Sequence, residues 1–178
     1  RLLDFINEGT AHRHQLLFWD QLLIKTGGYL TDKRGEYIHF VNECQMSNVK
    51  CQIEYDKSVI SGSRLAQYAD EEVGAKATLV GPHRDDFIIY KADKELSKYG
   101  SRGEQRLAIL WLKLAELAYI EKQTGERPVL LLDDIFSELD EEHRRLVVDI
   151  IGKQQTILTS AEEDIIKTIG KGAQVIQL

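Results

Sequence analysis

Two groups of polar residues in the second half of the chain have the types and spacing to do chemistry. The first is the segment 101–106, where Ser101, Gly103 and Gln105 run directly into an apolar pattern of helical period. Backbone N–H groups at a helix start, joined by a serine hydroxyl, can bind an anion such as a phosphate. Ser101 and Glu104 also match the Ser-x-x-Glu capping box, which explains these two residues without a ligand. It does not explain Gly103, because glycine costs a helix about 1 kcal/mol relative to alanine.

The second group is the pair Asp133 and Asp134, which directly follows the apolar run 129–132. In open parallel sheets, ligands bind beyond the carboxyl ends of the strands. Adjacent carboxylates there are costly unless a cation or a proton transfer uses them. An apolar strand that ends in acids is the Walker B arrangement, in which the first Asp supports Mg²⁺ and the next acid polarises a water. A plain strand followed by an acidic turn is the alternative, and this short stretch leaves both open.

The elements that would position these groups follow from the pattern after Ser101. We predict a long helix from Ser101 that Gly125 and Pro128 end, because apolar residues recur on one of its faces. We then predict a strand at 129–132 covered on both faces, followed by a helix that begins at 140–142. The remaining predicted elements are a strand at 156–158, a helix from Ser160 and a strand at 173–178. This alternation predicts an α/β fold with a largely parallel sheet and flanking helices.

The first part of the chain has a different character. Between residues 10 and 43, apolar residues recur seven apart (Leu16, Leu23, Leu30 and Tyr37). This spacing suits a helical arm that packs on a partner helix, and two ordinary amphipathic helices are the equal alternative. We expect a break or bend at Gly27-Gly28. A strand is predicted at 49–55, a short helix from Ser63 to about residue 73, and strand-like segments at both ends of 77–90. The predicted domains are a helical arm with a short strand (1–74) and a second domain (75–178).

Composition narrows the class of protein. The chain has 178 residues, 43% hydrophobic, and a formal net charge of −6, which suits one domain, or one domain plus an appendage, with a sizeable core. The acidic balance argues against a generally basic nucleic-acid coat. Cys44 and Cys51 match no redox or zinc spacing, so we expect a reducing cytoplasm. No apolar stretch approaches the ~18 residues of a membrane span. The start at Arg1 within helical sequence suggests a fragment of a longer chain.

Together these segments resemble a known family. Residues 101–106 (SRGEQR) followed by 129–140 (VLLLDDIFSELD) resemble the signature motif, Walker B and D-loop of an ABC-type ATPase head. GPHRDD (81–86) and FWDQLL (18–23) resemble the version found in the RecF family of bacterial recombinational repair. The resemblance covers nearly the whole chain and is strong from residue 78 onward. It implies the C-terminal part of an ABC-type ATPase head with part of a helical arm domain.

The resemblance also implies roles for residues near the acids. Asp133 would support Mg²⁺, and Asp134 stands where many ABC proteins have the catalytic Glu. Ser137 and Asp140 match the D-loop, which crosses the interface of a head-to-head dimer. Asp140 also suits a helix N-cap, and both roles can coexist.

At the signature motif, Ser101, Gly103 and Gln105 would contact the γ-phosphate of ATP bound to the opposite subunit. This chain departs from the family by having Glu104 where the usual signature has Gln. An acid so near a triphosphate should repel it unless the capping box turns the carboxylate toward the backbone.

Two further departures concern the rest of the ATP site. The segment 157–163 has no switch histidine, although Thr159 or Ser160 could lie near the site. The P-loop pattern Gly-x-x-x-x-Gly-Lys-[Ser/Thr] occurs nowhere in the chain, and in RecF proteins it lies in the upstream half. We therefore expect this chain not to hydrolyse ATP alone. The stretch 83–86 is predicted to be either a polar network that braces the sheet or part of a nucleotide or DNA surface.

The function that the resemblance implies is an ATP-modulated DNA-binding clamp. It would dimerise on ATP and help load recombinase at single-strand gaps with the mediator proteins RecO and RecR. A Rad50-like head is one alternative, but the region before residue 74 is too short for its long heptad arms. A transporter ATPase subunit is another, but it would lack GPHRDD and would usually carry Glu after Asp133. A non-catalytic binding module is the third.

Overall fold

The computed structural model describes residues 2–10, 12–44, 50–138, 141–151, 154–161, 169 and 173–176. The chain divides into two compact units, one formed by Arg1–Asn42 with Gln52–Tyr90, the other by Glu43–Cys51 with Lys91–Leu178. The boundaries of these units differ from the domain boundary that the sequence predicts at residue 74. The division into domains 1–74 and 75–178 stays a prediction. No helix of the described residues is both long and apolar enough to cross a membrane.

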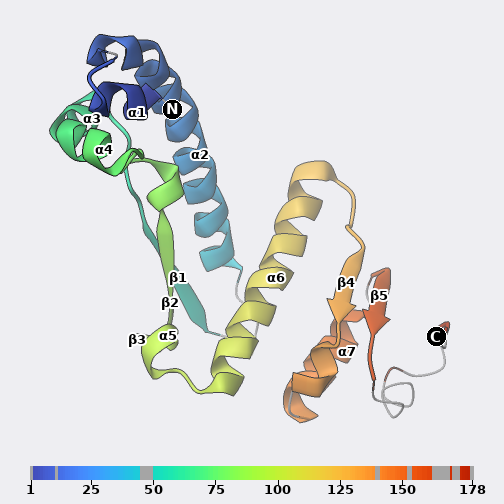
Figure 1. Cartoon of the computed structure of the whole chain (residues 1–178). Coiled ribbons are helices and arrows are strands. Elements are labelled where there is room, and N and C mark those ends of the chain that lie inside the picture. The colour runs from blue at the N-terminus through green and yellow to red at the C-terminus, as the bar shows by residue number, and fades with distance from the viewer. Residues whose placement is uncertain are drawn as a thin grey trace. The chain divides into compact units, whose positions relative to one another are not determined.

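The first unit is mainly helical, and Figure 1 labels its α-helices and strands. It contains α1 (Leu2–Asn7), a 3-10 turn η1 (Arg13–Leu16), α2 (Leu17–Glu43), β1 (Cys51–Asp56), α3 (Gly62–Gln67), α4 (Ala69–Ala75), a 3-10 turn η2 (Pro82–Arg84) and β2 (Asp86–Lys91). The end residues Glu43, Cys51 and Lys91 of these elements belong to the second unit. Its core consists of the buried side chains of Ile60, Leu65 and Val80, against which Leu23 and Ile24 of α2 pack. The strand predicted at 49–55 is observed as β1 over Cys51–Asp56. The single helix predicted from Ser63 to about residue 73 is divided into α3, which begins at Gly62 with Ser61 as its N-cap, and α4.

The expected break at Gly27-Gly28 is wrong, because α2 continues through both glycines. A Cβ on Gly27 would lie 3.0 Å from Cγ2 of Ile60 and 3.1 Å from Cδ of Pro82, whereas a Cβ on Gly28 would meet nothing within 4 Å. Gly27 thus lets a neighbouring segment approach the helix closely, and the tertiary contact outweighs the poor helix propensity of the pair.

The strand expected directly before the Gly81-Pro82 turn is also wrong. Residues 77–80 form no ladder. The Glu72 side chain accepts a hydrogen bond from the N–H of Leu79 at 2.9 Å, and Val80 is buried in the core. Gly81 has φ of +120°, which turns the chain away from a strand path. The apolar residues here serve burial rather than strand pairing.

The second unit carries the residues with candidate chemistry. It contains β3 (Lys94–Glu95), α5 (Leu96–Tyr99), α6 (Arg102–Thr124), β4 (Leu130–Asp133), a 3-10 turn η3 (Ile135–Glu138), α7 (Glu141–Ile151) and β5 (Thr156–Thr159). Strands β4 and β5 are parallel neighbours, with Leu130 opposite Thr156 and Asp133 opposite Thr159 (Figure 1). The α/β prediction is therefore confirmed, as is the long helix, whose C-cap Gly125 is left-handed with φ of +74°.

One face of the β4–β5 pair is covered and the other is open. Leu110, Phe136 and Val147 form the core, and Leu132 and Leu158 pack against it. On the opposite face Leu131 is 69% exposed and Ile157 58% exposed. The expectation that 129–132 is covered on both faces is wrong here, because side chains alternate along a strand and the described core lies on one face only. The predicted helix after Ser160 falls almost entirely outside the described residues, and residues 173–176 are not in a strand.

Candidate functional site

The start of α6 is built as the sequence predicts. Ser101 has extended backbone angles and caps the helix, its Oγ accepting a hydrogen bond from the N–H of Glu104 at 3.2 Å. In return, Oε2 of Glu104 accepts from the N–H of Ser101 at 3.0 Å. The capping box is confirmed, and it does turn the Glu104 carboxylate back toward the backbone.

The negative charge of Glu104 has a positive partner. Nζ of Lys91 lies 3.1 Å from Oε1 of Glu104, in a pair whose side chains are 33% and 40% exposed. The hydrogen bond from the backbone N–H of Ser101, followed by the Lys91 ammonium and the Ser101 hydroxyl, lowers the pKa of Glu104 from 4.5 to about 2. Glu104 is therefore ionised at neutral pH and fully engaged.

The other two signature residues differ in what they do within the chain. A Cβ on Gly103 would meet nothing within 4 Å, so no packing contact requires glycine there. Gln105 instead braces the turn before the helix, since its Nε2 donates to the carbonyl oxygen of Leu96 at 2.9 Å. Gly100 completes this turn, because a Cβ there would lie 2.7 Å from the same carbonyl oxygen. Gly103 leaves the first turn of α6 open to a ligand or a partner, while Gln105 stabilises the turn that precedes the helix.

Asp133 is the last residue of β4 and Asp134 follows it, so the two acids lie at the ends of the paired parallel strands. Oγ1 of Thr159, at the end of β5, donates to Oδ1 of Asp133 and accepts from the N–H of Asp134 at 3.2 Å. The N–H of Asp134 also lies 3.2 Å from the carbonyl oxygen of Thr159. Of the two residues that the sequence proposed near this site, the structure places Thr159 directly on both acids. The β4–β5 register could not be read from the sequence, so the pairing of Thr159 with Asp133 was not foreseen.

Asp134 has an unusual backbone and a hydroxyl partner. Its φ of 45° is left-handed, a conformation that Asp and Asn tolerate better than most residues. Oγ of Ser137 lies 2.8 Å from the carbonyl oxygen and 2.9 Å from Oδ2 of Asp134. Asp133, Asp134 and Ser137 are all exposed, so their polar atoms can reach a ligand. Asp140 lies outside the described residues.

The donor set is compatible with Mg²⁺ without forming a complete site. Magnesium prefers hard oxygen ligands and is usually held by one or two carboxylates together with phosphate oxygens and waters. The exposed carboxylate of Asp133 could supply one such ligand. Within the described part of the chain, no group of three or more His, Cys, Asp or Glu side chains could hold a metal ion by itself. The remaining ligands would have to come from a nucleotide, water or other protein residues.

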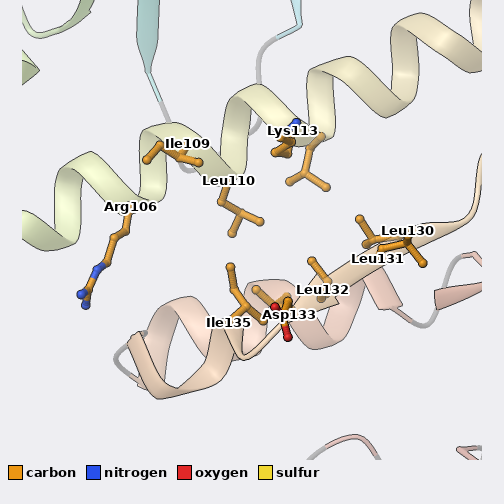
Figure 2. Close-up of a pocket in the computed structure, with 11 residues that line it drawn as sticks. Arg106, Ile109, Leu110, Lys113, Leu130, Leu131, Leu132, Asp133 and Ile135 are labelled. Carbon is orange, nitrogen blue, oxygen red and sulfur yellow. The ribbon is translucent and has the colours of Figure 1, made fainter. Parts of the chain in front are cut away.

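A pocket of about 240 Å³ lies between α6 and β4, with Asp133 at its lining. Figure 2 shows Leu110 pointing from α6 toward the strand, with Arg106 further along the same helix. Most of the lining is apolar, and its charged members are Arg106, Lys113 and Asp133. Both Ser101 and the two acids are described, and no hydrogen bond or ion pair joins them. The structure therefore presents the helix start and the acid pair as two separate groups.

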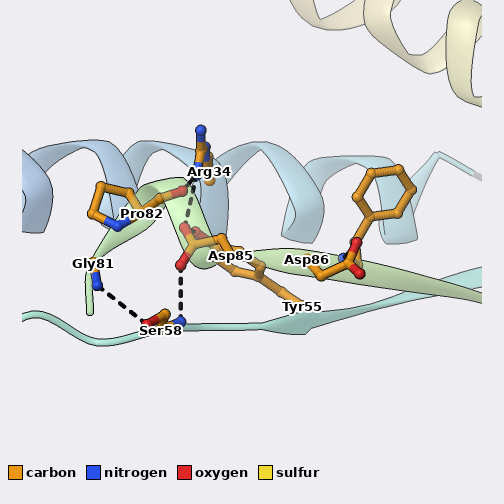
Figure 3. Close-up of polar contacts among 8 residues, drawn as sticks. Arg34, Tyr55, Ser58, Gly81, Pro82, Asp85 and Asp86 are labelled. Carbon is orange, nitrogen blue, oxygen red and sulfur yellow. Dashed lines mark hydrogen bonds and ion pairs between the residues drawn. The ribbon is translucent and has the colours of Figure 1, made fainter. Parts of the chain in front are cut away.

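The first unit contains a third polar group, centred on Asp85 of the GPHRDD stretch (Figure 3). Oδ2 of Asp85 accepts from Nη1 of Arg34 at 2.8 Å and from the hydroxyl of Tyr55, and Oδ1 accepts from the N–H of Ser58 at 2.8 Å. Arg34 also donates to the carbonyl oxygen of Pro82. The Asp85 side chain is only 3% exposed. For Asp85, the structure shows the bracing network, which joins α2, the end of β1 and η2.

Opposing effects set the pKa of Asp85. Burial raises this pKa, but the hydrogen bonds from Tyr55 and Ser58 and the ion pair with Arg34 lower it by more. The pKa of Asp85 therefore lies below its ordinary value of 3.8. Its neighbours His83, Arg84 and Asp86 are exposed. Sequence reasoning did not find Arg34, Tyr55 and Ser58 as partners, because they lie 27 to 51 residues away along the chain.

Comparisons with known proteins found relatives by sequence and by structure. No family model matches the chain. The DNA replication and repair protein RecF of Roseiflexus castenholzii is 39% identical over 174 residues, covering 84% of this chain and 44% of that protein. The protein of the same name from Lachnoclostridium phytofermentans is 37% identical over 155 residues, covering 81% and 43%.

Solved structures give the same result. A structure described as the recombination mediator protein RecF-ATPrS in the RecFOR pathway matches with a TM-score of 0.77 and 31% identity, covering 92% of this chain and 49% of that one. A RecF-ATP structure matches with a TM-score of 0.76. The chain spans about half the length of the relatives it matches. By sequence and by fold, it is similar to the C-terminal half of RecF proteins.

Proposed function

We propose that this chain is the C-terminal part of an ATP-dependent DNA-binding protein of recombinational repair. The intact protein would dimerise on ATP and help load recombinase at single-strand gaps. Support comes from relatives named as DNA replication and repair proteins, and from structural neighbours described as RecF with ATP in the RecFOR pathway. The partners proposed on this basis are DNA, a second copy of the protein, and the mediators RecO and RecR. The proposed location is the cytoplasm.

The observation that carries the ATP proposal is the arrangement of Asp133, Asp134 and Thr159 at the ends of β4 and β5. The hydrogen bond from Thr159 orients the Asp133 carboxylate, which stays exposed and suits Mg²⁺. Asp134 is held in its left-handed turn by hydrogen bonds to Thr159 and by the Ser137 hydroxyl. In the proposed protein, Asp133 supports the metal and Asp134 polarises the attacking water.

The start of α6 has its proposed role across the dimer. Ser101 and the open first turn at Gly103 would contact the γ-phosphate held by the opposite subunit. Gln105 would support this contact by holding the preceding turn, since its amide already binds the Leu96 carbonyl oxygen. Ser137 and Asp140 would lie at the same dimer interface.

The test compares the 178-residue chain with a full-length RecF protein that carries this sequence. We expect negligible ATP turnover from the chain alone, because no residue in it can replace the P-loop lysine. In the full-length protein, Asp134→Asn should reduce ATP turnover by roughly 10²-fold or more and leave an ATP-bound dimer that sedimentation detects. Asp149→Asn, on the exposed side of α7, is the matched control and should change neither measurement. Parental turnover by Asp134→Asn would refute the assignment of Asp134.

A further inference from the structure

The proposed function assigns no role to the ion pair between Lys91 and Glu104. Lys91 is the last residue of β2, and Glu104 is in the first turn of α6. The capping box needs only a side-chain oxygen at position 104, which glutamine supplies as well as glutamate. The carboxylate therefore adds a negative charge where the proposed function requires a phosphate to approach.

The contacts of Glu104 show how this charge is managed. Oε2 accepts from the N–H of Ser101 at 3.0 Å and lies 3.1 Å from the Ser101 hydroxyl. An ionised carboxylate can only accept, so the hydroxyl donates its hydrogen to Glu104. Oε1 is held by Lys91 at 3.1 Å. Each carboxylate oxygen thus has a donor, and the hydroxyl hydrogen that a γ-phosphate would need is already used.

A phosphate can receive that hydrogen only if Ser101 releases Glu104. After release, Oε2 keeps the N–H of Ser101 and Oε1 keeps Lys91, so the carboxylate retains two donors and a neutralising charge. Without Lys91, the charge of the Glu104 carboxylate would not be neutralised when the phosphate approaches. The carboxylate would then have only two donors, the N–H and the hydroxyl of Ser101, and would hold the hydroxyl more firmly. Lysine is suited to this task, since its compact ammonium carries three donors on a flexible stem.

We propose that Lys91 is a positioning residue for the signature motif: it holds and neutralises Glu104 so that the Ser101 hydroxyl can turn from Glu104 to the γ-phosphate. This inference rests on the proposed function, in which Ser101 contacts ATP across the dimer. It explains how a chain with Glu at this position can keep a phosphate-binding helix start. It also predicts that Lys91 matters only while position 104 is acidic.

The experiment is a double-mutant cycle in the full-length protein. For each variant, sedimentation measures the ATP concentration at which half of the protein is dimeric. Lys91→Met should raise this concentration by about fivefold, the upper range for a half-exposed charge pair. Glu104→Gln should dimerise at least as readily as the parent. In Lys91→Met/Glu104→Gln the effect of losing Lys91 should vanish. Lys94→Met is the matched control, because Lys94 is exposed and forms no ion pair with Glu104, and it should leave the concentration unchanged.

The outcomes separate the inference from the function on which it rests. If the parent does not dimerise with ATP, the proposed function fails and this inference fails with it. If the parent dimerises and Lys91→Met matches it, only the inference is overturned. A fivefold loss that persists in the double variant would also overturn it, because Lys91 would then act through packing of its stem. Thermal melts of all variants show whether a loss comes from unfolding instead.

Discussion

Asp85 in the first unit and the pair Asp133-Asp134 in the second use the same functional group in opposite ways. The Asp85 carboxylate is buried, and both of its oxygens accept hydrogen bonds from within its own unit. Asp133 and Asp134 are exposed, and their partners are the hydroxyls of Thr159 and Ser137, which orient them without neutralising their charge. A satisfied buried carboxylate stabilises a fold, whereas an oriented exposed one is available for chemistry.

Glu104 lies between these two cases. It is 40% exposed, like a surface residue, yet its oxygens are all engaged by Ser101 and Lys91. Asp85 and Glu104 both have lowered pKa values, but their hydrogen-bond partners differ. Asp85 is buried among partners from distant segments, whereas Glu104 belongs to a local helix cap. The comparison therefore predicts a gradient of effects on stability from Asp85 to Glu104 to Asp134.

The largest effect should come from Asp85→Ala. Removing one partner of a buried charged network leaves the Ser58 N–H and the Tyr55 hydroxyl without their acceptor. Because Arg34 is 46% exposed and can return to water, we expect a loss near the low end for such networks, about 3 kcal/mol of unfolding free energy. Urea denaturation of the chain measures it. Asp86→Ala is the matched control and should cost less than about 0.5 kcal/mol, since Asp86 is exposed. Equal losses at both positions would show that burial of the Asp85 carboxylate adds nothing to stability.

A smaller, pH-dependent effect is expected from Glu104→Gln. The pKa of Glu104 in the folded chain is about 2, below its ordinary 4.5. Its charge therefore contributes stability above pH 4.5, and this contribution is lost as the pH falls from 4.5 to about 2. Gln keeps the capping box but does not titrate. We expect the parent to melt about 2 °C or less above the variant at neutral pH, with the difference closing near pH 2. A difference that does not change with pH would show that the charge of Glu104 contributes nothing.

The smallest effect on stability is expected from Asp134→Asn. Asparagine tolerates the left-handed backbone at φ of 45°, and its amide oxygen can still accept from Ser137. The change in unfolding free energy should stay within about 0.5 kcal/mol. Asp134→Ala sharpens the result, because alanine does not favour that backbone and should cost about 1 kcal/mol. If Asp134→Asn destabilised the chain as much as Asp85→Ala, the acid would have to be counted as part of the structural framework.

Some of this molecule could be predicted because the determinants are local. The helix from Ser101 to Gly125 depends on a cap, an apolar repeat and a left-handed glycine, all within the segment itself. The acids after β4 follow from a short apolar run that ends in Asp133. The failures at Gly27-Gly28 and at 77–80 have the opposite cause. There, Ile60 and Pro82 lie against Gly27, and the Glu72 side chain binds the Leu79 N–H. Contacts between distant segments outweighed local propensity.

The residues that carry candidate chemistry, and the elements that present them, could be identified from the sequence, because caps, periodicity and strand-end acids act over a few residues. The hydrogen-bond and ion-pair partners of these residues became known only from the folded structure. The β4–β5 register placed Thr159 on Asp133, and the meeting of α2, β1 and η2 buried Asp85 against Arg34 and Tyr55. Lys91 was brought onto Glu104 across thirteen residues of chain. Hydrogen bonds and ion pairs require atoms within about 3 Å, and only the folded chain brings residues from separate segments that close.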